Sequence, residues 1–237
     1  MRILLTLTLM LSLMPAAVMA KSNSDDISPS QVTEGFRISP VPEASLTFKR
    51  GQRAAVGRGS YIVNGIGGCG GCHSYPEYLA AAPGDPFNGM PSSQSLKTVI
   101  VANYNVAHFM AGGQCFGPFM ARNITPDTDG LPADLTQANF IAMMRTGEDF
   151  ECENDPSDPI CAIEPPTPVL QVMPWPAFHN MTDQDLKAVY AYLSALPAAQ
   201  PCNTPTDGCP GFSGTAKSSA SYAYTNSADC PNPAPSQ

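Results

Sequence analysis

The feature that most constrains this sequence is the short stretch GIGGCGGCHSY at residues 65–75. Cys69 and Cys72 stand three positions apart with only glycine between them, and His73 follows at once. Thiols at this spacing are one helical turn apart, and the intervening glycines have no Cβ, so the backbone can lie close to a bulky group. The stretch therefore predicts a site of attachment around which the rest of the chain has to fold.

Three chemistries use a Cys-x-x-Cys pair. A redox-active pair normally follows a strand and opens a helix in an α/β pattern, but this one follows a helical segment, and no parallel strands are found. A zinc site needs further ligands, and the six other cysteines form no second close Cys-x-x-Cys. Covalent haem remains: Cys69 and Cys72 would add to its two vinyl groups, and His73 would supply an imidazole to the iron. One such motif predicts one haem c.

A six-coordinate electron carrier needs a second axial ligand, and a methionine sulfur raises the reduction potential relative to a second imidazole. Met173 is favoured, because Pro174 and Pro176 stiffen its loop, VMPWPAFH. Trp175, the only tryptophan, is expected to shield the haem or to donate its indole N–H to a propionate, with ordinary core packing as the alternative. The ligands that stay open as alternatives to Met173 are Met90, Met110, Met120, His108 and His179.

Residues 1–20 predict export. An apolar run follows a basic residue, and Val18 and Ala20 are placed for cleavage. An uncleaved membrane anchor is the alternative, disfavoured because Pro15 interrupts a run shorter than the usual span of about 20 residues. We therefore expect a periplasmic or otherwise exported protein with no membrane span in the mature chain.

Six further cysteines are expected to form disulfides in such an oxidising compartment. Three lie in the body and three in the Pro/Ser-rich tail at residues 198–237, so full pairing includes an odd number of body-to-tail bridges and staples the tail down. The pattern does not choose among their pairings. These six are Cys115, Cys152, Cys161, Cys202, Cys209 and Cys230.

Three helices are predicted between these ends. The apolar positions of residues 52–66 approximate a helical face that runs into the cysteine motif. A second helix is expected between the N-cap Thr136 and the stop Gly147, and the clearest one begins after Thr182 and ends at Pro197.

The remaining segments predict little regular structure. Residues 21–50 are polar and punctuated by Pro and Ser, which indicates an extended N-terminal arm. Residues 74–133 and 148–180 are rich in Gly and Pro and indicate long loops, which favour wrapping around a bulky group over an independent domain. Few helices with such loops predict an all-α body with something apolar at its middle.

The body resembles a known family. Its matching stretches, in order, are RGSYIVNGIGGCGGCH, ARNITPDTDG, FIAMMRTG and MPWPAFHNMTDQDLKAVYAYLSALP. They resemble the single-haem class I cytochrome c domains of the haem subunits of periplasmic alcohol and aldehyde dehydrogenases. The resemblance spans residues 51–197 and implies the class I cytochrome c fold. Its implied site residues are Cys69 and Cys72 on the haem, His73 and Met173 on the iron, Arg122 near a propionate, and Gly59 with Tyr190 or Tyr192 where the first and last helices cross.

The expected function is electron transfer by a His/Met-ligated haem between a periplasmic dehydrogenase or other donor and a downstream acceptor, without catalysis by the chain itself. Twelve basic against twenty acidic residues disfavour nucleic acid and suit brief docking onto a basic partner. Two alternatives stay open: a haem enzyme or gas sensor with an open distal site, and a haem-bearing docking subunit.

Overall fold

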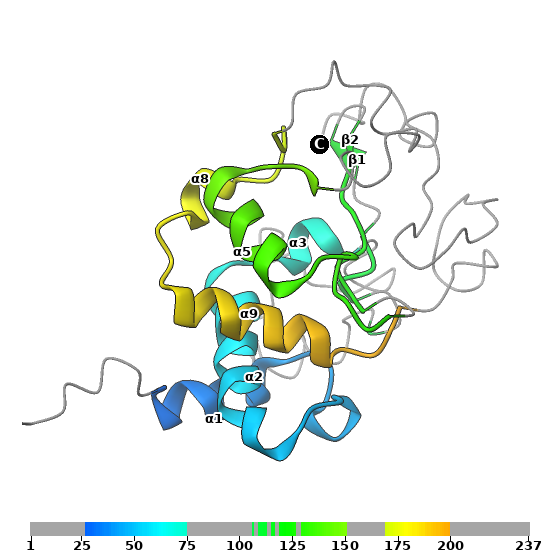
Figure 1. Ribbon diagram of the computed structural model, residues 1–237. Coiled ribbons are helices and arrows are strands. Elements are labelled where there is room, and N and C mark those ends of the chain that lie inside the picture. Colours follow the sequence, from blue (N-terminus) through cyan, green and yellow to red (C-terminus); the bar gives the residue numbers. More distant parts are fainter. Residues whose placement is uncertain are drawn as a thin grey trace, which may run out of the picture.

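Figure 1 shows the computed structural model of the chain, whose described residues are 27–74, 106, 109–112, 115–116, 119–126, 129–150 and 169–199. This part is all-α, as expected, apart from a short antiparallel β-hairpin whose strands, β1 (Cys115–Phe116) and β2 (Phe119–Met120), have two residues each. The α-helices are α1 (Pro29–Ile38), α2 (Arg53–Ser60), α3 (Gly70–His73), α5 (Gln137–Thr146), α8 (Trp175–Phe178) and α9 (Asp183–Ala195). The other helical segments are η1 (Glu43–Ser45) and η2 (Arg50–Gln52), which are 3-10 helices, and η3 (Tyr61–Ile66), a π-helix.

Helices α2 and α9 cross at a glycine. A Cβ placed on Gly59 would collide with the backbone oxygen of Ala188 and lie 2.8 Å from the Cβ of Tyr192, so only glycine permits this approach. The expectation that Gly59 meets Tyr190 or Tyr192 at a helix crossing is confirmed for Tyr192. The hydroxyl of Tyr190 instead donates to the backbone oxygen of Leu135, at 2.9 Å.

The extended-arm interpretation of residues 21–50 is wrong for residues 29–38, which form α1. Pro29 occupies the first turn, where its fixed φ favours a helix and its missing N–H costs nothing. Gly35 packs against the backbone of Gly57, and a Cβ on Gly57 would lie 2.7 Å from side-chain atoms of Val32 and Phe36. Helix α1 is therefore part of the fold and lies against α2, as Figure 1 shows.

A buried hydrogen-bond network joins the three packed helices. The Tyr192 hydroxyl lies 2.8 Å from Oγ of Ser39 and accepts from the side-chain amide of Asn64 at 3.2 Å. Ser60 donates through Oγ to the backbone oxygen of Gly35, at 2.7 Å. Because buried polar groups need partners, this network fixes how α1, η3 and α9 meet.

The expected helices are otherwise found where the sequence predicts them. Oγ1 of Thr136 accepts from the backbone N–H of Asn139 at the start of α5, and Gly147 ends that helix with φ of 75°. Oγ1 of Thr182 accepts from the backbone N–H of Asp185 at the start of α9. The segment at 52–66 divides into α2 and η3, and the loop expected over 148–180 contains the short helix α8.

The apolar core lies between α2, α5 and α9. Its least exposed large side chains are Tyr192, Met110, Leu186, Val56 and Val63. Cys69 and Met173, each half-buried, both pack against this same core cluster. Within the described ranges, no helix has the length and apolarity needed to cross a membrane.

Several expectations fall on residues outside the described ranges. These are the leader at residues 1–20, the tail beyond residue 199, the ligand alternatives Met90 and His108, and the disulfides of Cys152, Cys161, Cys202, Cys209 and Cys230. Cys115 and Met120 lie in the β-hairpin, where only their backbone is described.

Candidate cofactor site

The two motif cysteines lie on one helical turn. Cys69 is the N-cap residue of α3, and its backbone oxygen accepts from the N–H groups of Cys72 at 3.2 Å and His73 at 2.9 Å. Neither thiol forms a disulfide, and both are half-buried. The spacing expected from the sequence is thus realised as a helical turn that carries two thiols outside any disulfide, followed directly by the imidazole.

The Cys69 thiol is less acidic than an ordinary cysteine, whereas the reactive thiol of a redox-active pair is more acidic. The pKa of Cys69 is raised to about 11, chiefly by burial; a backbone hydrogen bond lowers it and the neighbouring Cys72 raises it by smaller amounts. A redox-active Cys-x-x-Cys motif works through a thiolate whose pKa is lowered. The structure therefore argues against the redox-pair alternative for this motif.

His73 is oriented by a backbone carbonyl. Its Nδ1 lies 2.8 Å from the backbone oxygen of Arg122, and this bond assigns the proton to Nδ1 because a carbonyl can only accept. Nε2 is then the nitrogen with a lone pair for a metal, the usual arrangement when an outer partner fixes the tautomer of a ligand histidine. Burial lowers the pKa of His73, which favours the neutral imidazole that a metal requires.

Backbone hydrogen bonds hold this histidine from a second direction. The backbone oxygen of His73 accepts from the N–H of Gly112 at 2.7 Å, and Oγ of Ser74 accepts from the N–H of Met110 at 2.9 Å. The Met110 carbonyl in turn accepts from the N–H of Ile124, at 2.9 Å. Three segments distant in sequence therefore meet around His73.

Gly112 makes this meeting sterically feasible. It has φ of 81°, and a Cβ there would lie 2.5 Å from the backbone oxygen of Ala121 and 2.6 Å from the carbonyl carbon of Arg122. The peptide that presents the acceptor to His73 thus packs directly against the bare face of a glycine. Sequence reasoning missed Gly112 and Ser74, since neither is part of the Cys-x-x-Cys-His motif itself.

Arg122 has a partner that was not foreseen. Its guanidinium donates to both carboxylate oxygens of Asp149, NH1 to Oδ1 at 2.7 Å and NH2 to Oδ2 at 2.8 Å. The Asp149 side chain is only 7% exposed, and that of Arg122 is 26% exposed. The expected contact of Arg122 with a propionate stays a prediction, but its guanidinium is already neutralised by this carboxylate.

Met173 lies in a loop docked onto the end of α5. The N–H of Leu170 donates to the backbone oxygen of Gly147 at 2.7 Å, and Glu148 forms a β-bridge with Val169. The indole of Trp175 covers Gly147 so closely that a Cβ there would collide with the ring. The structure thus shows Trp175 packed on Gly147, which holds the loop of Met173, and the expected contact of Trp175 with haem stays a prediction.

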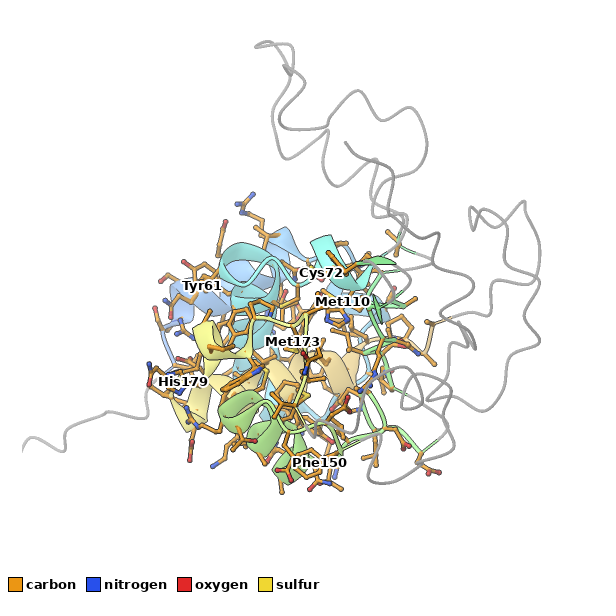
Figure 2. The ribbon with its side chains drawn as sticks, turned by 90° about the horizontal axis from the view of Figure 1, so that it is seen from above. Tyr61, Cys72, Met110, Phe150, Met173 and His179 are labelled. Carbon is orange, nitrogen blue, oxygen red and sulfur yellow. The ribbon has the colours of Figure 1, made fainter. Side chains whose placement is uncertain are left out.

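The far end of this loop is fixed by Arg145. Its guanidinium donates to the backbone oxygen of His179 and, at 2.6 Å, to Oδ1 of Asp183. His179 is exposed at the end of α8, and Figure 2 shows it at the edge of the molecule while Met173 lies toward the middle. The surface position of His179 makes it the weaker ligand candidate of the two.

The other described alternative is Met110, which is fully buried in the core cluster with a backbone φ of 61°. Figure 2 places it near Cys72 in the view from above. Because its side chain already packs within the apolar core, core packing accounts for Met110 and Met173 remains the favoured ligand. Among the described residues no three His, Cys, Asp or Glu side chains cluster as metal ligands.

Comparison with known proteins adds nothing to this geometry: no protein-family model, curated protein or solved structure matches the chain.

Proposed function

We propose that the chain is an exported single-haem c-type cytochrome with the class I fold, which passes single electrons between a donor such as a periplasmic dehydrogenase and a downstream acceptor. The observation that carries the proposal is the state of His73: its Nδ1 is committed to a carbonyl, its pKa is lowered, and two thiols that form no disulfide stand on the preceding turn. All three are what covalent attachment and iron ligation require.

The residues present fit a covalent haem c. Cys69 and Cys72 would form the thioethers, Nε2 of His73 the first axial bond, and the Met173 sulfur the second. The bound iron would supply a centre that cycles between two oxidation states without binding substrate. A protonated Cys69 thiol, with its pKa near 11, is a poor nucleophile by itself, so thioether formation on this chain would depend on dedicated attachment machinery.

The chain's own contribution is to hold the ligands and exclude water. The carbonyl of Arg122 strengthens the imidazole as a donor by accepting its Nδ1 proton. The core cluster that Cys69 and Met173 contact keeps the surroundings apolar, which is one of the factors that set the potential of such a centre. Neither role needs an acid, a base or a nucleophile.

Two exposed apolar side chains support a docking role near the site. Ile66 is 65% exposed and precedes Cys69 by three positions, and Val172 is 40% exposed and precedes Met173 directly. Exposed apolar side chains beside the ligand-bearing segments suit brief contact with a redox protein, and the acidic excess suits a basic partner.

The attachment is tested by expressing the full chain with its leader in a host that matures c-type cytochromes. We expect the purified protein to be coloured, with a mass that includes one haem that organic solvent does not extract. In Cys69→Ala and Cys72→Ala variants the number of thioether bonds should fall from two to one. A colourless wild-type protein would refute the proposed function.

The sulfur ligand is tested by comparing two methionines near the same loop. Met173→Ala should lower the reduction potential and let carbon monoxide bind the reduced iron at once, whereas Met181→Ala, which removes a core contact, should leave the iron spectrum unchanged. Rapid carbon monoxide binding by the wild-type protein would instead favour a gas sensor or haem enzyme with an open site.

A further inference from the structure

The two ligand-bearing parts of the molecule are joined by an ion pair. On one side, the peptide of Arg122 accepts the Nδ1 proton of His73. On the other, Asp149 directly follows Glu148, which bridges to Val169 four positions before Met173. The side chains of Arg122 and Asp149 close the gap with two hydrogen bonds, of 2.7 and 2.8 Å.

We infer that Asp149 is a positioning residue: through Arg122 it ties the peptide that orients His73 to the segment that anchors the loop of Met173. The inference rests on the proposed function, because it assigns Asp149 to the spacing between the two iron ligands. It also gives Arg122 a role other than the expected contact with a propionate. Its guanidinium pairs with Asp149, and its backbone carbonyl accepts from Nδ1 of His73.

The geometry of the pair suits such a tie. A bidentate arginine–carboxylate contact fixes orientation as well as distance, because two parallel hydrogen bonds join two planar groups. Asp149 is nearly buried, so little water competes for its oxygens. Its neighbours are fixed too: Gly147 lies under the indole of Trp175, and Phe150 packs against the core cluster.

A second bidentate pair in the same chain provides the matched control. Arg53 donates to Glu43 through Nε at 2.7 Å and NH2 at 3.0 Å, and these side chains are 50% and 39% exposed. That pair joins α2 to η1 and includes no residue of the candidate site. Glu43→Gln therefore removes one carboxylate from a bidentate pair, as Asp149→Asn does, without touching either ligand-bearing segment.

The experiment compares haem-loaded wild type with Asp149→Asn, Arg122→Gln, the double variant and Glu43→Gln. The measured quantity is the dissociation constant of imidazole, which displaces the sulfur ligand of the oxidised protein and changes its absorption. Each single variant should bind imidazole about ten-fold more tightly, which corresponds to about 1.4 kcal/mol. The double variant should match the singles, because residues that act as one unit are not additive. Glu43→Gln should stay within about two-fold of wild type.

Two results of the imidazole titration would overturn the inference. In one, Asp149→Asn binds imidazole as wild type does. In the other, Asp149→Asn and Arg122→Gln shift imidazole affinity in opposite directions, as expected if Arg122 acts by its charge on a haem propionate. Asp149→Glu keeps the carboxylate and should restore part of the wild-type affinity, which distinguishes positioning from general loss of folding.

Trp175 provides a readout that does not depend on haem. As the only tryptophan, packed on Gly147 two positions before Asp149, it reports on this anchor by its fluorescence. Asp149→Asn and Arg122→Gln should shift its emission alike, and Glu43→Gln should not. A haemless wild type would refute the proposed function, whereas unchanged emission in both Asp149→Asn and Arg122→Gln would refute the tie.

Discussion

The two sides of the candidate site are built differently. The His73 side, residues 69–74, 109–112 and 121–126, is held by backbone hydrogen bonds among buried groups, with Met110 and Ser74 almost fully enclosed. The Met173 side, residues 147–150 and 169–179, is a loop with exposed Val172, Pro174 and Pro176, docked at a few points. Changes on the first side should therefore cost folding free energy, and changes on the second should mainly alter ligation.

The largest effect is expected at Gly112, on the His73 side. Gly112→Ala puts a Cβ against the backbone of Ala121 and Arg122, which cannot yield as a side chain can, at a φ of 81° that disfavours alanine. We expect a loss of about 4 kcal/mol in the free energy of unfolding, measured by urea titration. Gly51→Ala, where no atom lies within 4 Å of the added Cβ, is the control. Equal losses at both glycines would contradict the described packing.

The second-largest loss of stability is expected at Met110, and comparing it with Met173 distinguishes effects on folding from effects on iron ligation. Met110→Ala removes a fully buried side chain and should cost about 3 kcal/mol while leaving the iron spectrum unchanged. Met173→Ala should do the reverse, with a changed spectrum and a small loss of packing from a half-buried side chain. An altered iron spectrum in Met110→Ala would transfer the ligand role to Met110.

Gly147 is the counterpart of Gly112 on the Met173 side. Gly147→Ala meets an indole, which can shift, and a φ of 75°, so its cost should be about 2 kcal/mol, smaller than at Gly112. The displaced Trp175 should change its fluorescence in the folded protein, because it is the ring against the new methyl group. A cost equal to that of Gly112→Ala would show that both sides are equally rigid.

The smallest effect concerns pH and Tyr192 of α9. Its hydroxyl accepts a hydrogen bond from Asn64 of η3, the helical segment that leads into the His73 side. Burial raises the pKa of Tyr192, with hydrogen bonds from Ser39, Asn64 and Ser60 acting in the opposite direction. A raised folded pKa means that its stabilisation is present below the unfolded pKa, about 10, and is lost as pH rises through the folded pKa. Unfolding at pH 8 and pH 11 should show this loss. The Tyr192→Phe variant should be about 1 kcal/mol less stable than wild type at pH 8. Between pH 8 and pH 11 its free energy of unfolding should fall less than that of wild type.

Local patterns in the sequence predict much of this fold. Thr136, Gly147 and Thr182 are found in the roles that their side chains and backbones favour, because capping depends on only a few neighbouring residues. The helical turn of the cysteine motif was predictable for the same reason. Helix α1 was missed, although Ser28 followed by Pro29 is a recognisable helix start and Val32 and Phe36 share a face.

The remaining parts of the site depend on contacts between distant segments. Nothing near Asp149 in the sequence indicates that its carboxylate meets Arg122, because that pairing depends on how two loops approach each other in space. Gly112 likewise has no local signal, since its importance comes from the peptide packed against it. The comparison of the two sides therefore became available only with the structure.

The contact between Gly35 and Gly57 bears on how the protein is best produced. A shortened version starting at residue 51 would expose the face of α2 that α1 covers, uncover Gly57, and leave Ser60 without its acceptor. An affinity tag or fusion partner on the N-terminal side therefore belongs ahead of residue 27, and the shortest fragment worth purifying keeps the whole of α1.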